Sequence, residues 1–186
     1  MKTIANMSRI YELLNGWRAL GSLRFRSGVE VLGLVPQADR DCWMHVIFPG
    51  WSREVMTETE SLLGTSMPTW LRSFYRHCGG MSLFSGAFLL HGRVAPGYMV
   101  GDDALQPADL LQLNREVGAM GWLSEGSVVF ASNAWDLSVY VAEGGPGGAQ
   151  ASILRCDRKT GAVLEIHNDL IEFLDSKLHR LDSLQV

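Results

Sequence analysis

The most reactive side chains in this sequence stand next to each other at His77 and Cys78. An imidazole that takes the proton of a thiol creates a strong nucleophile, provided that the two groups lie within hydrogen-bonding distance. Successive residues of a helix point about 100° apart, so neighbours on a helix do not share a proton easily. We therefore expect Cys78 to be a buried core residue, with a catalytic thiol as the alternative.

The other polar residues do not form a pattern typical of a metal or phosphate site. The five histidines make no i, i+4 pair and have no cysteine or carboxylate cluster at zinc-ligand spacing: His45, His77, His91, His167 and His179. The glycine-rich stretch at residues 143–150 lacks the Gly-Lys-Ser/Thr ending of a phosphate-binding loop and is expected to be a hairpin loop. Asp102 and Asp103 could hold a divalent ion but are expected to be solvated. We predict no catalytic residue, no cofactor and no metal.

Tryptophans beside turn signals are the best candidates for contact with another protein. Trp51, Trp122 and Trp135 lie next to Gly50, Gly121 and Asn133, where full burial is difficult, and tryptophan is favoured as an interface anchor. Nearby carboxylates would steer a basic partner toward them. The predicted protein-binding residues are Trp51, Asp102, Asp103, Trp122, Glu125, Trp135, Asp136 and Glu143.

The composition is that of a folded, mildly acidic chain. Its 186 residues are 47% hydrophobic and 19% charged, which is enough for one compact core with an appended segment. The net charge of −4 disfavours general binding to nucleic acid or to an anionic membrane. Three distant cysteines indicate a reducing compartment. Because the first residues lack an uninterrupted apolar leader and no window offers about 18 apolar residues, we expect a cytoplasmic protein.

Hydrophobic periodicity predicts the elements that hold these residues. Residues 3–15 are predicted to form an amphipathic helix that ends at Gly16, and residues 20–48 to form two or three short strands. A second helix should run from an N-cap at Ser52 to a C-cap at Gly64. Its apolar side would consist of Val55, Met56, Thr59, Leu62 and Leu63.

The middle of the chain predicts two further helices around a strand. One helix should open at Pro68 and end at Gly79 and Gly80, and a strand should follow over residues 83–90. Its buried stripe would be Leu71, Phe74, Tyr75 and Cys78. The next helix should open at Pro107 and end near Gly118 or Gly121, with Leu110, Leu113 and Val117 as its apolar face and Leu111 beside them.

The last third predicts an antiparallel meander closed by a helix. Strands are predicted at residues 128–132, 138–142, 152–156 and 162–167, with a hairpin turn in which Gly161 has a positive φ. Asn168 would cap a helix with the stripe Leu170, Leu174, Leu178 and Leu181. Helices and strands do not alternate along the chain, so we expect an α+β fold in which helices pack against a mostly antiparallel sheet.

The segment 60–84, ESLLGTSMPTWLRSFYRHCGGMSLF, resembles the signature of the SMI1/KNR4 (SUKH) superfamily. That signature is a helix with E-x-x-L-G, an L-P pair that opens a second helix, and N-G-G before a short apolar strand. Met67 replaces the usual leucine and Cys78 the usual asparagine. The matching positions are Glu60, Leu63, Gly64, Pro68, Leu71, Phe74, Tyr75, Gly79, Gly80, Leu83 and Phe84. The resemblance extends over residues 50–182, which divides the chain into a segment 1–49 and a domain 50–186.

The resemblance implies an α+β fold and, for bacterial members, an immunity protein that binds and neutralises a cognate toxin. The acidic residues near the tryptophans, Glu125, Asp136 and Glu143, would suit a toxin with a basic surface. The matched positions are glycines, a helix-opening proline and core anchors, so the resemblance implies no catalytic residue and no enzyme. Two alternatives stay open. One is a regulatory or scaffold adaptor of the same superfamily without a toxin partner. The other is an enzyme that uses Cys78, His91 or the loop with Asp102 and Asp103.

Overall fold

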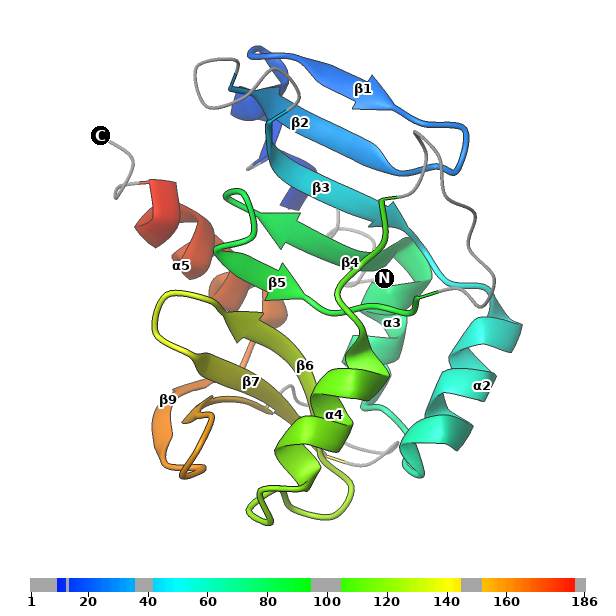
Figure 1. The fold of residues 1–186 in the computed structure, drawn as a ribbon, viewed down its shortest axis with the longest axis vertical. Helices are drawn as coiled ribbons and strands as arrows, with labels where there is room; N and C mark the ends of the chain where they lie inside the picture. Colours follow the sequence, from blue (N-terminus) through cyan, green and yellow to red (C-terminus); the bar gives the residue numbers. More distant parts are fainter. Residues whose placement is uncertain (1–9, 13, 36–41, 95–104, 145–151, 183–186) are drawn as a thin grey trace.

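Nine strands form one antiparallel sheet in which each strand pairs with its neighbours in sequence (Figure 1). The computed structural model describes residues 10–12, 14–35, 42–94, 105–144 and 152–182. The strands are β1 (Ser22–Arg24), β2 (Glu30–Leu34), β3 (Trp43–Pro49), β4 (Cys78–Leu83), β5 (Phe88–Leu90), β6 (Val128–Asn133), β7 (Ser138–Glu143), β8 (Ser152–Asp157) and β9 (Val163–His167). This arrangement confirms the predicted α+β class with an antiparallel sheet.

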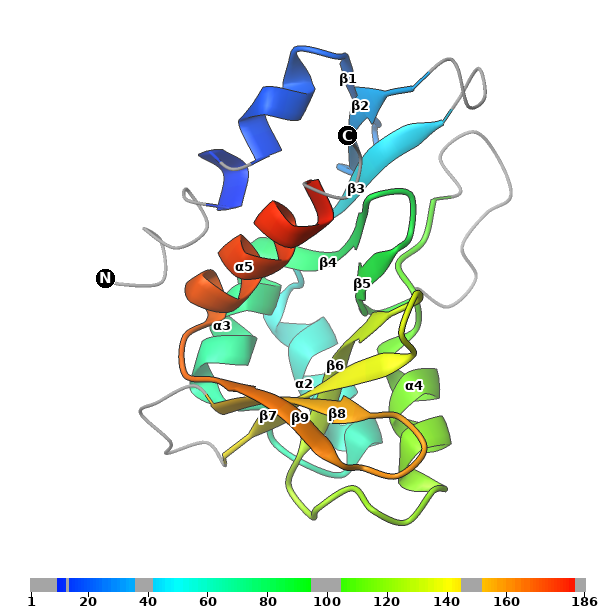
Figure 2. The same cartoon turned by 90° about the vertical axis from the view of Figure 1, so that its left-hand side faces the viewer.

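Helices cover both faces of this sheet. The labelled helices are α2 (Arg53–Leu63), α3 (Thr69–His77), α4 (Leu110–Gly118) and α5 (Leu170–Asp182). The N-terminal helix, described over residues 10–12 and 14–18, lies with α3 and α5 on one face, and α4 lies on the other (Figure 2). Strands β6 and β7 are therefore buried on both faces, which explains their unbroken apolar runs.

The N-terminal part of the chain joins the same sheet. Val31 of β2 pairs with Val46 of β3, and Ile47 of β3 pairs with Met81 of β4, so the sheet is continuous across position 49/50. Two or three strands were predicted between residues 20 and 48, and the structure has three. The predicted helix end at Gly16 is wrong, because the helix continues to position 18 and the chain turns at Gly21, where φ is +120°.

Helix α2 has the two caps that were predicted. The Ser52 side chain accepts a hydrogen bond from the Val55 amide, and Gly64 is left-handed with φ +69°. Met56 is buried, but Leu62 is 58% exposed and does not belong to the buried side. Helix α3 follows Pro68 and buries the predicted stripe, Leu71, Phe74, Tyr75 and Cys78.

The two glycines after α3 do not cap it. Cys78 ends the helix in an extended conformation and already belongs to β4, so Gly79 and Gly80 are strand residues. A Cβ on Gly79 would collide with the Pro49 carbonyl oxygen and lie 2.9 Å from Trp51 Nε1. Gly79 is therefore required because two backbones approach each other closely, and not because a helix ends there.

The predicted strand over residues 83–90 is a hairpin. Strands β4 and β5 are joined by a tight turn in which Phe84 and Ser85 adopt φ +50° and +52° before Gly86. Phe84 is nevertheless buried, against the rings of Trp17 and His45. Burial of this aromatic ring offsets the strain of a left-handed backbone at a non-glycine residue.

The C-terminal meander agrees with the prediction. Strands β6 to β9 pair in order, and Gly161 has φ +72° in the turn between β8 and β9. The N-caps differ by a few residues, because the side chains of Asp109 and Asp169 accept the first amides of α4 and α5, in place of a start at Pro107 and a cap at Asn168. The stripe of α5 contains Leu170, Leu174 and Leu178, while the Leu181 side chain lies outside the described residues.

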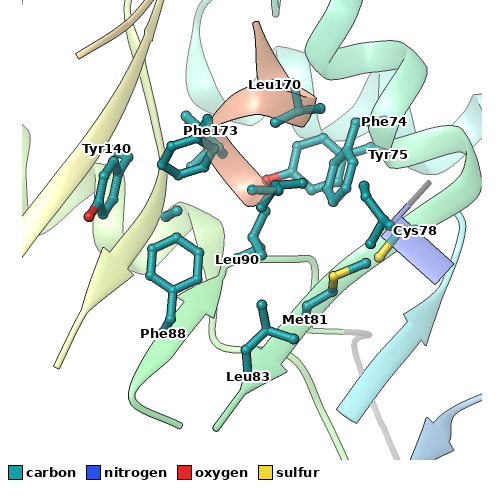
Figure 3. Close-up of a cluster of buried hydrophobic side chains, with 14 of the residues drawn as sticks. Phe74, Tyr75, Cys78, Met81, Leu83, Phe88, Leu90, Tyr140, Leu170 and Phe173 are labelled. Carbon is teal, nitrogen blue, oxygen red and sulfur yellow. The ribbon is translucent and has the colours of Figure 1, made fainter. Parts of the chain in front are cut away.

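The main core lies between the sheet and the helices α3 and α5 (Figure 3). Phe173 of α5, which the predicted stripe omitted, packs against the rings of Phe88 and Tyr140 at centroid distances of 5.8 and 5.0 Å. A smaller core on the opposite face joins α4 to the sheet. It contains Leu113, Val117, Val129, Val139, Val141 and Cys156.

Candidate protein-binding site

Cys78 is a core residue, as expected. Its side chain is fully buried, its Sγ lies 3.1 Å from the carbonyl oxygen of Gly80, and burial raises the pKa of the thiol to about 12 (Figure 3). His77 is exposed, with Nδ1 2.8 Å from the Ser73 carbonyl oxygen. A thiol that stays protonated and is shielded from solvent is a poor nucleophile.

His45 is the most completely buried histidine of the described residues. Its ring contacts Trp17 and Phe84 edge-on, at centroid distances of 5.1 and 4.7 Å, and neither ring nitrogen has a hydrogen-bond partner. Burial lowers its pKa to about 4. His45 is thus a neutral core residue, and no ligand could reach it from solvent.

Trp51 lies largely inside the protein, in contrast to the exposure expected beside Gly50. It is only 9% exposed and stacks in parallel on Tyr75 with a centroid distance of 4.0 Å. The exposed edge helps to line a mainly apolar pocket of about 250 Å³ between the end of β3, α2 and residues 105–107. Arg93 lines the same pocket and donates to Glu58 over 3.1 Å.

Trp122 supports a turn and is half-buried. Its Nε1 donates to the Arg158 carbonyl oxygen over 3.0 Å, and its ring lies so close to Gly161 that a Cβ there would come within 2.6 Å of it. The Trp122 side chain therefore packs the segment after α4 against the turn between β8 and β9. This role accounts for the position of Trp122 without a partner.

The turn between β6 and β7 presents two large apolar side chains to solvent. Trp135 and Leu137 are each 58% exposed. We call residues 134–137 the Trp135 turn. Side chains brace it from both ends, because Asn133 Oδ1 accepts from the Trp135 amide over 2.8 Å and Asp136 Oδ1 accepts from the Ser138 amide over 2.9 Å. Leu137 adopts φ +55°, a left-handed conformation that favours glycine or asparagine.

A chain of ion pairs fixes the Trp135 turn to the rest of the sheet. Arg155 of β8 donates to Asp136 of the turn and to Glu165 of β9, each over 2.7 Å, and Lys177 of α5 donates to Glu165 over 3.0 Å. Burial opposes the ionisation of Asp136, but hydrogen bonds from Ser138 and the Arg155 charge outweigh it and lower its pKa. Glu165 has a lowered pKa as well, because Lys177 and Arg155 outweigh the effect of burial.

A cleft opens between α4 and the Trp135 turn, and we call it the α4 cleft. It encloses about 460 Å³. The residues that line it are Leu89, His91, Ala108, Asp109, Gln112, Leu113, Glu116, Ser132, Asn133, Ala134, Leu137, Ser138 and Arg158. Figure 2 shows α4 on the same side of the molecule as the two turns that end the cleft, the Trp135 turn and the turn between β8 and β9.

A histidine and a serine meet at the floor of the α4 cleft. His91 Nε2 lies 2.8 Å from Ser132 Oγ, and His91 Nδ1 lies 3.4 Å from the Asp109 carbonyl oxygen. Burial is the main cause that lowers the His91 pKa to about 4, which makes it a weak general base. The nearby amides of Gly92 and Ala134 donate to other carbonyl oxygens, so they do not form an oxyanion hole. The pair is better suited to binding than to acyl transfer.

The structure brings only some of the predicted residues together. Trp135 and Asp136 lie in the Trp135 turn, whose residues Ala134 and Leu137 line the α4 cleft. Trp122 donates to the carbonyl oxygen of Arg158, which also lines the cleft. Trp51 lines a different pocket. Glu143 is the last residue of β7, at the other end of that strand from Asp136, and Glu125 is exposed in the segment between α4 and β6. Asp102 and Asp103 lie outside the described residues.

Sequence reasoning missed the residues that shape the site most. Leu137 precedes a strand and carries no turn signal, although Asn133, Asp136 and Ser138 around it are typical turn-bracing residues. The approach of His91 to Ser132 depends on the pairing of β5 with β6, across 41 positions of sequence. No spacing rule along the chain could have found that pair.

Comparison of the sequence with protein-family models and with curated proteins gives no match. Among the described residues, no helix combines the length and the apolar character that a membrane crossing requires.

Proposed function

We propose that this protein binds another protein through the Trp135 turn and the adjoining α4 cleft. The observation that carries the proposal is Leu137, which combines an exposed apolar side chain with a left-handed backbone. A left-handed backbone costs a non-glycine residue about 1–2 kcal/mol, and a side chain that remains in water regains little of it. A partner that covers the Leu137 side chain would supply the burial that offsets this cost, which the free protein does not supply.

The surroundings of Leu137 suit an interface anchor. Trp135 stands two residues away with the same exposed fraction, and tryptophan is enriched among residues that dominate binding energy. The turn is held by the Asn133 and Asp136 side chains and by Arg155, so a partner meets a surface that is already ordered. Little conformational entropy is then lost on binding.

The resemblance to the SMI1/KNR4 superfamily supports a specific partner, a bacterial toxin whose activity the bound protein blocks. Under this proposal the segment 60–84 builds the scaffold, since Cys78 and Gly79 lie in packed positions, and the binding surface lies elsewhere. The carboxylate of Asp136 is already paired with Arg155, so a basic toxin is held mainly by the apolar anchors.

Co-expression with the toxin-like product of the adjacent open reading frame tests this proposal. The wild-type chain should rescue growth and co-purify with that product, and Trp135→Ala together with Leu137→Gly should abolish both effects. Leu62→Ala is the matched control, because Leu62 has the same exposed fraction of 58% on α2. Full rescue by the double variant would contradict the proposed surface. Capture of a housekeeping or signalling protein, without rescue, would favour the adaptor alternative.

A further inference from the structure

The hydrogen-bonding pattern at the floor of the α4 cleft has only one consistent assignment. The Asp109 carbonyl oxygen can only accept, so His91 Nδ1 carries the ring proton and donates to it. His91 Nε2 is then an acceptor, and the Ser132 hydroxyl donates to it over 2.8 Å. Ser132 Oγ has no proton left for a ligand. Toward a ligand in the cleft, Ser132 Oγ can therefore act only as a hydrogen-bond acceptor.

The charged groups of the cleft have the same bias toward accepting. The lining residues that the structure describes include two carboxylates, Asp109 and Glu116, and one guanidinium, Arg158. Arg158 donates to Glu116 Oε2, and the amide group of Gln112 donates to Glu116 Oε1 over 2.8 Å. Asp109 Oδ1 meanwhile accepts the Leu111 and Gln112 amides as the N-cap of α4. With two carboxylates against one guanidinium, the described lining carries a formal charge of −1.

A basic side chain satisfies this pattern, and an acidic one does not. A guanidinium or ammonium group brings several donors for Ser132 Oγ and the carboxylates, and its aliphatic stem can pack on Leu137 at the rim. An acidic group would meet a neutral imidazole whose ring proton is already donated, in a lining where two carboxylates outnumber one guanidinium. We propose that the α4 cleft receives an arginine or lysine side chain of the bound protein. This inference rests on the proposed function, and it specifies the chemistry of the partner.

Titration with small probes tests the chemistry of the cleft without the partner. N-acetylarginine amide should shift the amide resonances of Gln112, Ser132 and Leu137 in NMR spectra at millimolar concentration, and N-acetylglutamate amide should not. Glu116→Gln and Ser132→Ala should each weaken the arginine probe at least fivefold. Glu58→Gln is the matched control, because Glu58 pairs with Arg93 in the other pocket, and it should bind the probe like wild type.

Equal shifts from the glutamate probe, or no cleft shift from 50 mM of the arginine probe, would overturn the inference. Thermal melting of Glu116→Gln and Ser132→Ala shows whether either variant fails to fold. If one of them does, the affinity of the other, folded variant for the arginine probe decides the test. If the arginine probe does not bind the cleft selectively but Trp135→Ala loses partner binding, only the proposed chemistry of the cleft is refuted, and the proposed binding surface stands. Partner binding that survives the loss of Trp135 and Leu137 would refute the proposed function itself.

Discussion

Leu137 is the residue that distinguishes a binding surface from an ordinary turn. If the fold gains nothing from its side chain, Leu137→Gly should not destabilise the free protein, because relief of the left-handed strain offsets the greater freedom of glycine in the unfolded chain. We expect a change in the free energy of unfolding between about 0 and 1 kcal/mol in the stabilising direction, measured by urea denaturation. A loss of more than 1 kcal/mol would mean that the Leu137 side chain supports the fold.

Gly79 shows how a glycine that the fold requires can be given the wrong physical reason. Its strand position faces the Pro49 carbonyl oxygen and Trp51 with no room for a Cβ. Gly79→Ala should therefore lower the free energy of unfolding by several kcal/mol, comparable to severe overpacking. Gly16→Ala is the matched control. Gly16 is helical with open space around it, so alanine there should stabilise the protein by about 0.5–1 kcal/mol. Equal effects of the two substitutions would contradict this account.

His45 makes the stability of the fold depend on pH. Its pKa is about 4 in the folded protein and near 6.5 when unfolded, so the unfolded chain binds the extra proton between these values. Stability should fall as the pH drops from 6.5 to 4, by roughly 1.4 kcal/mol per pH unit for each such histidine. His91 adds a second contribution of the same sign.

Substitution of His45 separates these two contributions. His45→Phe removes two unpartnered ring nitrogens from an aromatic environment, so it should be at least as stable as wild type at pH 7. Between pH 6.5 and 4 its stability should decline about half as steeply, since His91 is then the one remaining histidine of this pair that binds its proton more weakly in the folded than in the unfolded chain. An unchanged slope in urea denaturation at several pH values would exclude His45 as a source.

At the scale of elements, the ion pairs around Arg155 connect the Trp135 turn, β8, β9 and α5. Because the pKa values of Asp136 and Glu165 are lowered, their contribution is present at neutral pH and is lost as the pH falls from about 4.5 downward. Arg155→Met should lower stability at pH 7 by about 1–3 kcal/mol and flatten the acid-induced loss. Arg72→Met should cost at most about 1 kcal/mol, because Arg72 pairs with Glu60 at 3.5 Å near the surface. Identical acid profiles for Arg155→Met and wild type would refute this role.

Elements with strong local signals were predictable, and those that depend on tertiary contacts were not. Helix α2 has a serine N-cap and a glycine C-cap, and the turn at Gly161 has the residue that a positive φ requires, so both were identified. The turn between β4 and β5 uses Phe84 and Ser85 at positive φ, which no local rule favours. That turn persists because Phe84 is buried beside His45, and this contact is made only in the folded chain.

At the scale of the whole molecule, the sheet decides which predicted site residues can act together. It places the Trp135 turn beside the α4 cleft, through Ala134 and Leu137, and it turns Trp51 inward onto Tyr75. Tryptophan and turn signals pointed equally to Trp51, Trp122 and Trp135, and the structure shows that Trp135 is exposed while Trp51 is buried. The α4 cleft consists of segments that meet only through strand pairing and the docking of α4. Its donors and acceptors could not be assigned from the sequence, because they depend on distances between His91, Ser132 and Asp109.

The most direct test of the central claim is the affinity of the toxin-like product of the adjacent open reading frame for wild type, Trp135→Ala and Leu62→Ala, measured by isothermal titration calorimetry. Truncation of an anchor tryptophan should cost at least 2 kcal/mol, about a thirtyfold rise in Kd, whereas Leu62→Ala should bind like wild type. Equal affinities of all three proteins, or absence of binding by the wild type, would contradict recognition of this partner through the Trp135 turn.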